Sequence, residues 1–250
     1  MSMQIHRAEN QNTGSFDNNR ILERKPIDFP NMNSAIAPFS ALVYWAYAWS
    51  EPGGTIGLHP HQAFEIMSVV LEGHIEHYDT NTIEWKRLSA GDVQIIRAGS
   101  GISHSERLLA ESKMFQIWFD PNVRESIKKP ASYNDYRSDV FPVEEYSNCR
   151  IKIISGPNSP LQMDSPVLIK QLDIEAGQTQ LSIPKKHIAA IFILGGEIIL
   201  NESNLSPGDL IVLEEENKFD INSDSKSKLF MIEVPKKLNY KRFADSVSRK

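Results

Sequence analysis

An internal repeat constrains the fold of this chain more than any other sequence feature. The segment "VVLEGHIEHYD…RLSAGDVQII" in the first half corresponds to "FILGGEIIL…NLSPGDLIVL" in the second half. Each copy reads as a strand, a Gly turn, a second strand, an Ala-Gly-Asp or Pro-Gly-Asp turn and a third apolar strand. The second copy has the shorter hairpin, because 11 residues separate Gly196 from Gly208 whereas 17 separate Gly73 from Gly91. The repeat predicts two lobes of one architecture.

Most of the remaining sequence also reads as strands. Segments such as 41–49, 65–73 and 113–119 are rich in β-branched and aromatic residues, and Gly, Pro, Asn and Asp separate them at short intervals. Helical periodicity over more than two turns can be read only in the tail from Leu238. The pattern predicts an all-β fold of antiparallel barrels or sandwiches.

The chain is long enough for two domains of roughly 120 residues each. The stretch "DPNVRESIKKPASYNDYRSDVFPVEEYS" is rich in Pro, Asp, Ser and charge, which is typical of a linker. We therefore expect an N-terminal lobe over residues 1–125, a linker over 126–145 and a C-terminal lobe over 146–250. One chain then supplies two packed lobes, which fits a monomer, although the barrel edges could still pair.

Charge and composition exclude several classes of function. The formal net charge of −5 gives neither a basic face for nucleic acid nor a polybasic patch for acidic lipid. The N-terminal segment lacks the apolar core of a signal peptide, and no apolar run approaches the ~20 residues of a membrane helix. The single cysteine, Cys149, excludes an internal disulfide and is expected to be a half-buried structural thiol. We expect a soluble cytoplasmic protein that binds neither nucleic acid nor membrane directly.

Two pairs of metal-ligating side chains occur at positions i and i+2. His59 and His61 lie in "GLHPHQAF", and His104 and Glu106 lie in "GSGISHSERL". Alternate residues of a strand point to the same face, so each pair projects from one face of its strand. Taken alone, His59 and His61 are more consistent with surface polar residues at the start of a strand than with a metal site. If both strands line one barrel, three imidazoles and a carboxylate converge, and this donor set suits a divalent first-row metal such as Fe, Mn, Ni, Cu or Zn.

The context of these pairs resembles a known family. Gly53, His59-x-His61, Glu65 and Gly73 have the spacing of the first cupin motif, and "GDVQIIRAGSGISH" resembles the second. "HPHQAFEIMSVVLEGHIEHYD" and "AGDVQIIRAGSGISHSE", together with the repeated second lobe, resemble the pirin family of bicupins. The resemblance is dense from about residue 53 to 119 and looser across the second lobe. It implies an all-β bicupin with two jelly-roll-like β-barrel lobes.

The resemblance also implies a metal site. In pirins the metal is bound by the histidines of His-Pro-His and by the histidine and glutamate of a later His-x-Glu, which correspond to His59, His61, His104 and Glu106. The implied cofactor is one divalent transition metal, with Fe favoured and Mn, Ni, Cu, Co and Zn left open. We expect it in the N-terminal lobe alone, because the second lobe contains neither His-x-His nor His-x-Glu.

Two functions follow from the resemblance. Bacterial pirin-like proteins cleave flavonols such as quercetin as metal-dependent dioxygenases, which predicts a small aromatic substrate and dioxygen as partners. Glu106 is then a catalytic residue that accepts the proton of a substrate hydroxyl, and Met67, Val69 and Phe115 are expected to be apolar walls that exclude water. Eukaryotic pirins act instead as iron-dependent partners of transcription factors. A non-catalytic regulatory protein that works through a protein partner is the alternative.

Several neighbouring residues carry further expectations. Glu65, the glutamate ligand of the generic cupin motif, is expected to support the site rather than bind the metal, because pirins use the later glutamate. His74 and His77 lie on opposite faces of one strand, and both are expected to be surface or structural residues. Gln62 and Ala63 replace the Arg-Gly that follows His-Pro-His in pirins, which predicts a difference in substrate preference.

Overall fold

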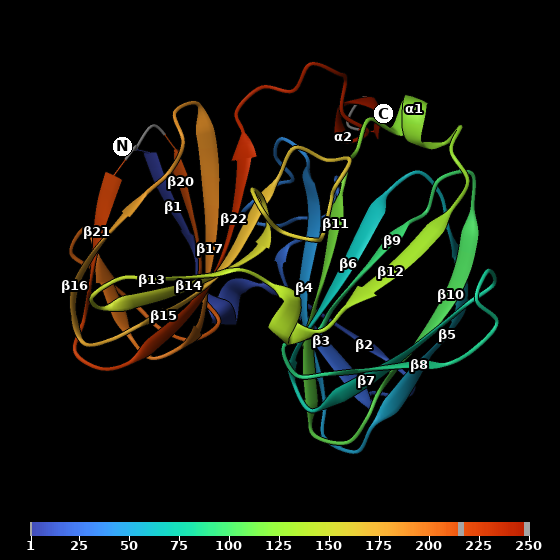
Figure 1. Cartoon of the computed structure of the whole chain (residues 1–250), viewed down its shortest axis with the longest axis horizontal. Coiled ribbons are helices and arrows are strands. Elements are labelled where there is room, and N and C mark those ends of the chain that lie inside the picture. Colours follow the sequence, from blue (N-terminus) through green and yellow to red (C-terminus); the bar gives the residue numbers. More distant parts are fainter. Residues whose placement is uncertain (1, 215–217, 248–250) are drawn as a thin grey trace. The chain divides into compact units, whose positions relative to one another are not determined.

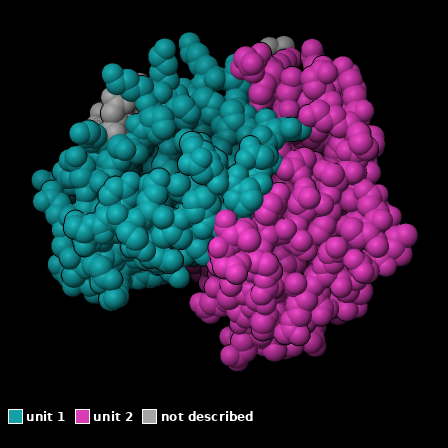
Figure 2. All heavy atoms as spheres, viewed as in Figure 1, with its two compact units in different colours: residues 1–10, 141–238 teal, residues 11–140, 239–250 magenta. Residues whose placement is uncertain are grey.

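The chain forms two compact units whose regular secondary structure is almost entirely antiparallel strand. The computed structural model describes residues 2–214 and 218–247. Unit 1 consists of residues 1–10 and 141–238, and unit 2 of residues 11–140 and 239–250 (Figure 2). Within the described residues, each unit has one seven-stranded and one four-stranded sheet (Figure 1). The predicted all-β bicupin fold is confirmed, although the outer ends of the expected lobes, residues 1 and 250, lie outside the described residues.

Unit 2 has a large sheet in the order β12-β9-β6-β11-β4-β3-β2 and a small sheet in the order β5-β10-β7-β8. Its strands are β2 (Asn12–Phe16), β3 (Ile21–Ile27), β4 (Leu42–Ser50), β5 (Gly54–His61), β6 (Glu65–Glu72), β7 (His74–Asp79), β8 (Lys86–Ser89), β9 (Val93–Arg97), β10 (Ile102–Leu108), β11 (Ser112–Phe119) and β12 (Ser132–Tyr136). It also contains the short helices α1 (Val123–Ser126) and α2 (Ala244–Val247) and the 3-10 turn Ser138–Val140.

Unit 1 has a large sheet in the order β1-β20-β17-β22-β15-β14-β13 and a small sheet in the order β16-β21-β18-β19. Its strands are β1 (Ser2–His6), β13 (Val143–Glu145), β14 (Cys149–Ser155), β15 (Leu168–Ile174), β16 (Gly177–Ser182), β17 (His187–Gly195), β18 (Ile198–Leu200), β19 (Ser203–Leu205), β20 (Leu210–Glu214), β21 (Lys218–Ser223) and β22 (Ser227–Pro235), with the 3-10 turn Ala8–Asn10 after β1. In the part of the chain that the structure describes, no helix is both long and apolar enough to span a bilayer.

The two units share one strand order, which is the structural form of the internal repeat. When β6 is matched to β17, β9 to β20 and β11 to β22, the strands of the two large sheets stand in the same order. The small sheets correspond in the same way, β5-β10-β7-β8 with β16-β21-β18-β19. In unit 2 the edge strand beside β9 is β12, and in unit 1 β1 takes the same place beside β20.

Strand pairing sets the borders of the units differently from the sequence-based division. Residues 1–10 belong with the second half of the chain because β1 pairs over its whole length with β20. Residues 239–250 belong to unit 2, where the Tyr240 hydroxyl donates a hydrogen bond to the Asp120 carbonyl. The expected linker over 126–145 contains the paired strands β12 and β13, so it is divided between the units.

Glycine is required at the equivalent turn of each copy of the repeat. Gly73 has φ 66° and Gly196 has φ 73°, both in the left-handed region. A Cβ at Gly196 would collide with the carbonyl oxygen of Lys226, and one at Gly73 would lie 3.0 Å from the carbonyl oxygen of Glu111. The backbone conformation and the close approach of a neighbouring strand therefore explain why both copies turn at Gly.

The interior of each sandwich is filled by alternate residues of its strands. In unit 2 the buried cluster consists of Ile21, Ala48, Val70, Ile75, Leu88, Leu108 and Met114. The larger cluster of unit 1 includes Leu172, Leu181, Ile191, Ile211, Phe219, Ile221, Leu229 and Met231. Because both sheets of each unit contribute to its cluster, burial of these side chains holds the sheets together.

Candidate metal centre

Two neighbouring strands of unit 2 bring the three predicted histidine ligands together. In the β5–β10 pair, His59 lies directly opposite His104, and His61 lies opposite Ile102. The ring centroid of His104 is 4.4 Å from that of His59 and 4.8 Å from that of His61. Each of the three histidines offers one ring nitrogen, and these atoms lie within 4.8 Å of one another. This spacing suits three ligands of one metal ion.

Glu106 joins this cluster through His104 rather than through His59 and His61. Its carboxylate, one ring nitrogen of His104 and one of His77 lie within 4.8 Å of one another. Its Oε2 accepts a hydrogen bond of 2.5 Å from Gln116, and its Oε1 accepts one of 3.1 Å from Ser68. The structure thus brings the four predicted ligands into two overlapping groups that share His104, and amide and hydroxyl donors hold Glu106.

The ring nitrogens of the cluster fit a metal site. Nε2 of His61 and both ring nitrogens of His104 are buried and have no hydrogen-bond partner among the described residues. Nδ1 of His59 lies 2.8 Å from the carbonyl oxygen of Gly57, which leaves Nε2 for another partner. Buried polar atoms are normally satisfied, so unsatisfied imidazole nitrogens that converge are the arrangement expected of ligands to a cation.

The electrostatic environment keeps the imidazoles of His61 and His104 neutral. Burial, followed by repulsion from His104 and His59, lowers the pKa of His61 to about 3. Burial, followed by repulsion from His59 and His77, lowers the pKa of His104 to about 2. Neutral imidazole is the form that binds a metal ion. The arrangement is therefore able to bind a divalent cation at neutral pH.

The residues around the ligands come from polar positions inside otherwise apolar strands. Ser68, Gln94 and Gln116 interrupt "IMSVV", "VQII" and "MFQIW", and all three side chains contact Glu106. Their sequence signal is a single polar residue in a buried apolar strand, and polar residues at such places need partners. Trp118, two residues after Gln116, packs edge-on against His61 at 4.7 Å between ring centroids. None of these four residues was expected at the site.

The three residues expected to form apolar walls of the site lie on the face of the large sheet that points away from it. Successive residues of a strand point to opposite faces. Because Ser68 and Gln116 face Glu106, their neighbours Met67, Val69 and Phe115 face away from the metal centre and are buried on the other side. The prediction that these three residues exclude water from the site is wrong. The apolar side chains beside the site belong to another cluster, Ile66, Ile96, Ala98 and Ile102, with Phe64, Trp118, Ala131 and Tyr133 packed against it.

Glu65 is also turned away from the three histidines. It is buried, and its Oε1 lies 3.6 Å from Nε of Arg97 on the neighbouring strand. The alternation that His59 and His61 begin does not continue to Glu65, because β5 ends at His61 and the chain enters the other sheet through Ala63, which has φ 68°. The structure therefore places Glu65 in a buried contact with an arginine, outside the groups able to hold a metal.

The two remaining histidines of this region differ in their surroundings. His74 is partly exposed, with its Nδ1 3.2 Å from the hydroxyl of Ser89. His77 is fully buried, and its Nε2 lies 2.9 Å from Oδ2 of Asp79. Of the surface and structural roles expected for these residues, the surface role is excluded for His77.

A cavity of about 450 Å³ lies beside the metal centre, with His61 in its lining. Its lining residues are Pro60, His61, Gln62, Thr80, Gly101, Ile102 and Ser103. Gln62 is fixed in this wall by a hydrogen bond of 3.1 Å from its Nε2 to the carbonyl oxygen of Ser100. Gln62, one of the two residues that depart from the pirin pattern, thus lies in the same cavity wall as His61.

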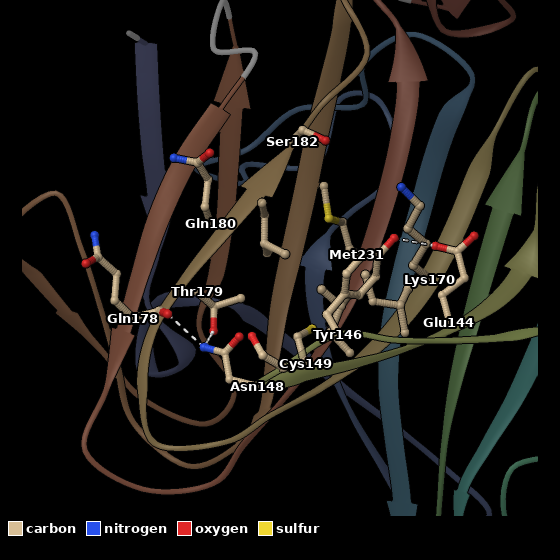
Figure 3. A pocket seen from close by; sticks show the side chains of 14 residues that line it. Glu144, Tyr146, Asn148, Cys149, Lys170, Gln178, Thr179, Gln180, Ser182 and Met231 are labelled. Carbon is tan, nitrogen blue, oxygen red and sulfur yellow. Dashed lines mark hydrogen bonds between the residues drawn. The ribbon is translucent and has the colours of Figure 1, made fainter.

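Unit 1 contains a separate cavity of about 620 Å³ between its two sheets. Tyr146, Cys149, Lys170 and Met231 line it, and Asn148 at its rim donates to the hydroxyl of Thr179 (Figure 3). The strands that correspond to β5 and β10 are β16 and β21. Their buried residues are chiefly Thr179, Leu181, Phe219 and Ile221, and imidazole and carboxylate groups are not among these side chains.

Comparison with known proteins relates this chain to pirins. Residues 23–119 match the family model of pirin. The chain is 28% identical over 199 residues to a quercetin 2,3-dioxygenase of Escherichia coli, which covers 74% of this chain and 78% of the relative. It is 30% identical over 192 residues to Pirin-1 of Arabidopsis thaliana, covering 70% of this chain and 65% of that protein.

A solved structure shows the same fold. The bacterial pirin of Escherichia coli in complex with nickel(II) superposes with a TM-score of 0.79 at 23% identity, covering 94% of this chain and 99% of that protein. The matched segment 23–119 contains both histidine motifs and Glu106. Family model, curated relatives and fold all relate this chain to pirins, and its residues 23–119 match the pirin domain.

Proposed function

We propose that this protein is a metal-dependent dioxygenase that opens the heterocyclic ring of flavonols such as quercetin. The observation that carries the proposal is the group of three converging histidines with a buried carboxylate beside it. The similarity to a protein named quercetin 2,3-dioxygenase supports the substrate class.

His59, His61, His104 and Glu106 are the proposed ligands of one divalent first-row ion. Fe is favoured, and Mn, Ni, Cu, Co and Zn are the alternatives, because imidazole and carboxylate donors suit all of them. Such an ion, when bound, supplies Lewis-acid and redox chemistry toward the oxygens of the substrate and dioxygen. The metal belongs in this proposal to unit 2 alone.

Glu106, a ligand at rest, is also the proposed acceptor of the proton from the flavonol hydroxyl, which requires partial release of its carboxylate from the metal. Its carboxylate is fully buried beside His104, and Gln116 and Ser68 hold its orientation. A general base needs a fixed position within hydrogen-bond reach of the proton that it takes. The substrate would approach through the cavity beside His61, where Gln62 contacts it and Trp118 supplies an aromatic surface behind the imidazole.

The test is oxygen-dependent loss of the flavonol absorbance band when quercetin is mixed with protein loaded with Fe, Mn, Ni, Cu or Co. We expect turnover with at least one metal, and strong loss of turnover in Glu106→Gln. His74→Ala is the matched control, because His74 lies near the surface of the same unit and should leave turnover unchanged. Absence of turnover with all five metals contradicts the enzyme and favours the non-catalytic iron-dependent regulatory protein.

A further inference from the structure

A strand beside β10 places two more chemistry-bearing side chains in the interior of unit 2. In the β7–β10 pair, His77 lies opposite Glu106 and Asp79 lies opposite His104. Opposed residues of an antiparallel pair point to the same face. All four side chains are fully buried. His77 and Asp79 therefore lie deeper in the sandwich than His59 and His61, which are partly exposed.

Asp79 determines which nitrogen of His77 carries a proton. Its Oδ1 accepts hydrogen bonds from the backbone N–H groups of Asn81 at 2.8 Å and Thr82 at 2.7 Å. Its Oδ2 lies 2.9 Å from Nε2 of His77. A carboxylate held by two backbone donors acts here as an acceptor, so Nε2 of His77 is the donor. Nδ1 of the neutral ring then presents a lone pair.

That lone pair is held in place and has no partner. Nδ1 of His77 is buried without a hydrogen-bond partner among the described residues. Tyr133 stacks on the ring with 4.4 Å between centroids and 12° between planes, which restricts rotation of the imidazole. A histidine that binds a metal nearly always donates its other N–H to a carboxylate or carbonyl. The Asp79–His77 pair has this arrangement before any metal is considered.

We propose that His77, His104 and Glu106 form an inner metal-binding set that overlaps the outer set of His59, His61 and His104. The three inner residues place one ligand atom each within 4.8 Å of the others. Both sets use His104, so they are two positions for one ion. The inner set includes the carboxyl group of Glu106 and is fully buried, whereas the outer set offers imidazoles alone, with His61 in the lining of the cavity. Attraction between the carboxylate and a cation is stronger at the buried position.

This inference rests on the metal site of the proposed function, so the experiment separates the two. Purified variants are equilibrated with nickel(II), dialysed and analysed for metal and protein. We expect about one Ni per chain in the wild type, and about one in the double variant His59→Ala/His61→Ala. Adding His77→Ala to the double variant should abolish binding, whereas adding His74→Ala, on the same strand, should not. X-ray absorption of the double variant should show two imidazole ligands.

Each result decides one of the two proposals. If the wild-type protein binds no Ni(II), this result contradicts the proposed metal-dependent enzyme. A wild type that binds Ni(II), together with a folded double variant that does not, overturns the inner set and leaves the outer site intact. Retention of Ni(II) in the triple variant also overturns the inner set. If the triple variant fails to fold by circular dichroism, Asp79→Asn in the double variant replaces it. We then expect Ni(II) affinity to fall about 10–100-fold, and an unchanged affinity contradicts the proposal.

Discussion

Gln116 donates a hydrogen bond of 2.5 Å from its Nε2 to Oε2 of Glu106. Gln116 belongs to the large sheet of unit 2 and Glu106 to the small one, so this bond crosses the interior of the sandwich. It fixes the position of a fully buried carboxylate next to His104. The hydrophobic sandwich thus contains a polar layer at the level of the metal centre.

Gln116→Leu should weaken metal binding. The substitution removes a donor that orients Glu106 and leaves a buried carboxylate oxygen without it, and loss of such supporting contacts typically costs about 10–100-fold in metal affinity. Competition against a chromophoric chelator measures the change for nickel(II). Lys113→Ala is the control on the same strand, because it alters only a surface ion pair with Glu72. An affinity equal to that of the wild type would show that Gln116 does not support the ligand.

Trp118 should report the binding of a metal at the outer histidines. Its ring lies 4.7 Å from that of His61, so an open-shell ion at this site should quench its fluorescence. Titration with nickel(II) should reduce tryptophan emission, and Trp118→Phe should remove most of the metal-dependent change. The other three tryptophans remain as the reference. Unchanged quenching in Trp118→Phe would place the ion elsewhere.

The stability of the metal-free protein should depend on pH through the buried histidines. Burial lowers the pKa of His61 to about 3 and of His104 to about 2, from an ordinary value of 6.5. Below pH 6.5 the unfolded chain binds protons at these residues while the folded chain does not, so the free energy of unfolding falls as the pH is lowered from 6.5 toward 3. A single group of this kind contributes at most about 1.4 kcal/mol per pH unit.

Urea denaturation at several pH values measures this dependence. His104→Asn should flatten it, because one of the two groups that resist protonation is gone. Equal slopes in the wild type and His104→Asn would contradict neutral burial of His104.

The repeated part of the fold could be predicted from the sequence, whereas the place of the N-terminal strand could not. The repeated Gly turns and Gly-Asp turns identify matching strands, and Gly73 and Gly196 occupy equivalent tight turns in the structure. The place of the N-terminus could not be predicted, because β1 pairs with β20 about 200 residues away and short edge strands carry little pattern. Long-range pairing, not local propensity, decides to which unit such a strand belongs.

The candidate site was predictable where its residues share one strand. His59 and His61, or His104 and Glu106, need only the alternation of a single strand. The direction of the Glu65 side chain does not follow from this rule, because the chain changes sheets at Ala63 and the alternation starts again. His77 stands at positions i and i+2 with Asp79 in "HIEHYD", but it was missed because its position opposite Glu106 depends on strand register, which the alternation of one strand does not give.

Cys149 should react slowly with thiol reagents in the folded protein. Its side chain is only 4% exposed, and burial together with Asp173 and Glu145 raises its pKa to about 11. The reactive thiolate is therefore scarce at neutral pH. Reaction with a chromogenic disulfide should be slow in buffer and complete within minutes in denaturant. Equally fast reaction in both would contradict the buried, protonated thiol.

The metal content of His104→Ala tests the central claim most directly, because every group of ligands described for the site includes His104. Wild-type protein and variant are equilibrated with nickel(II) under identical conditions, dialysed and analysed by elemental analysis, with folding checked by circular dichroism. The account predicts about one Ni per chain in the wild type and none in the folded His104→Ala variant. Equal metal content in both would contradict the metal centre.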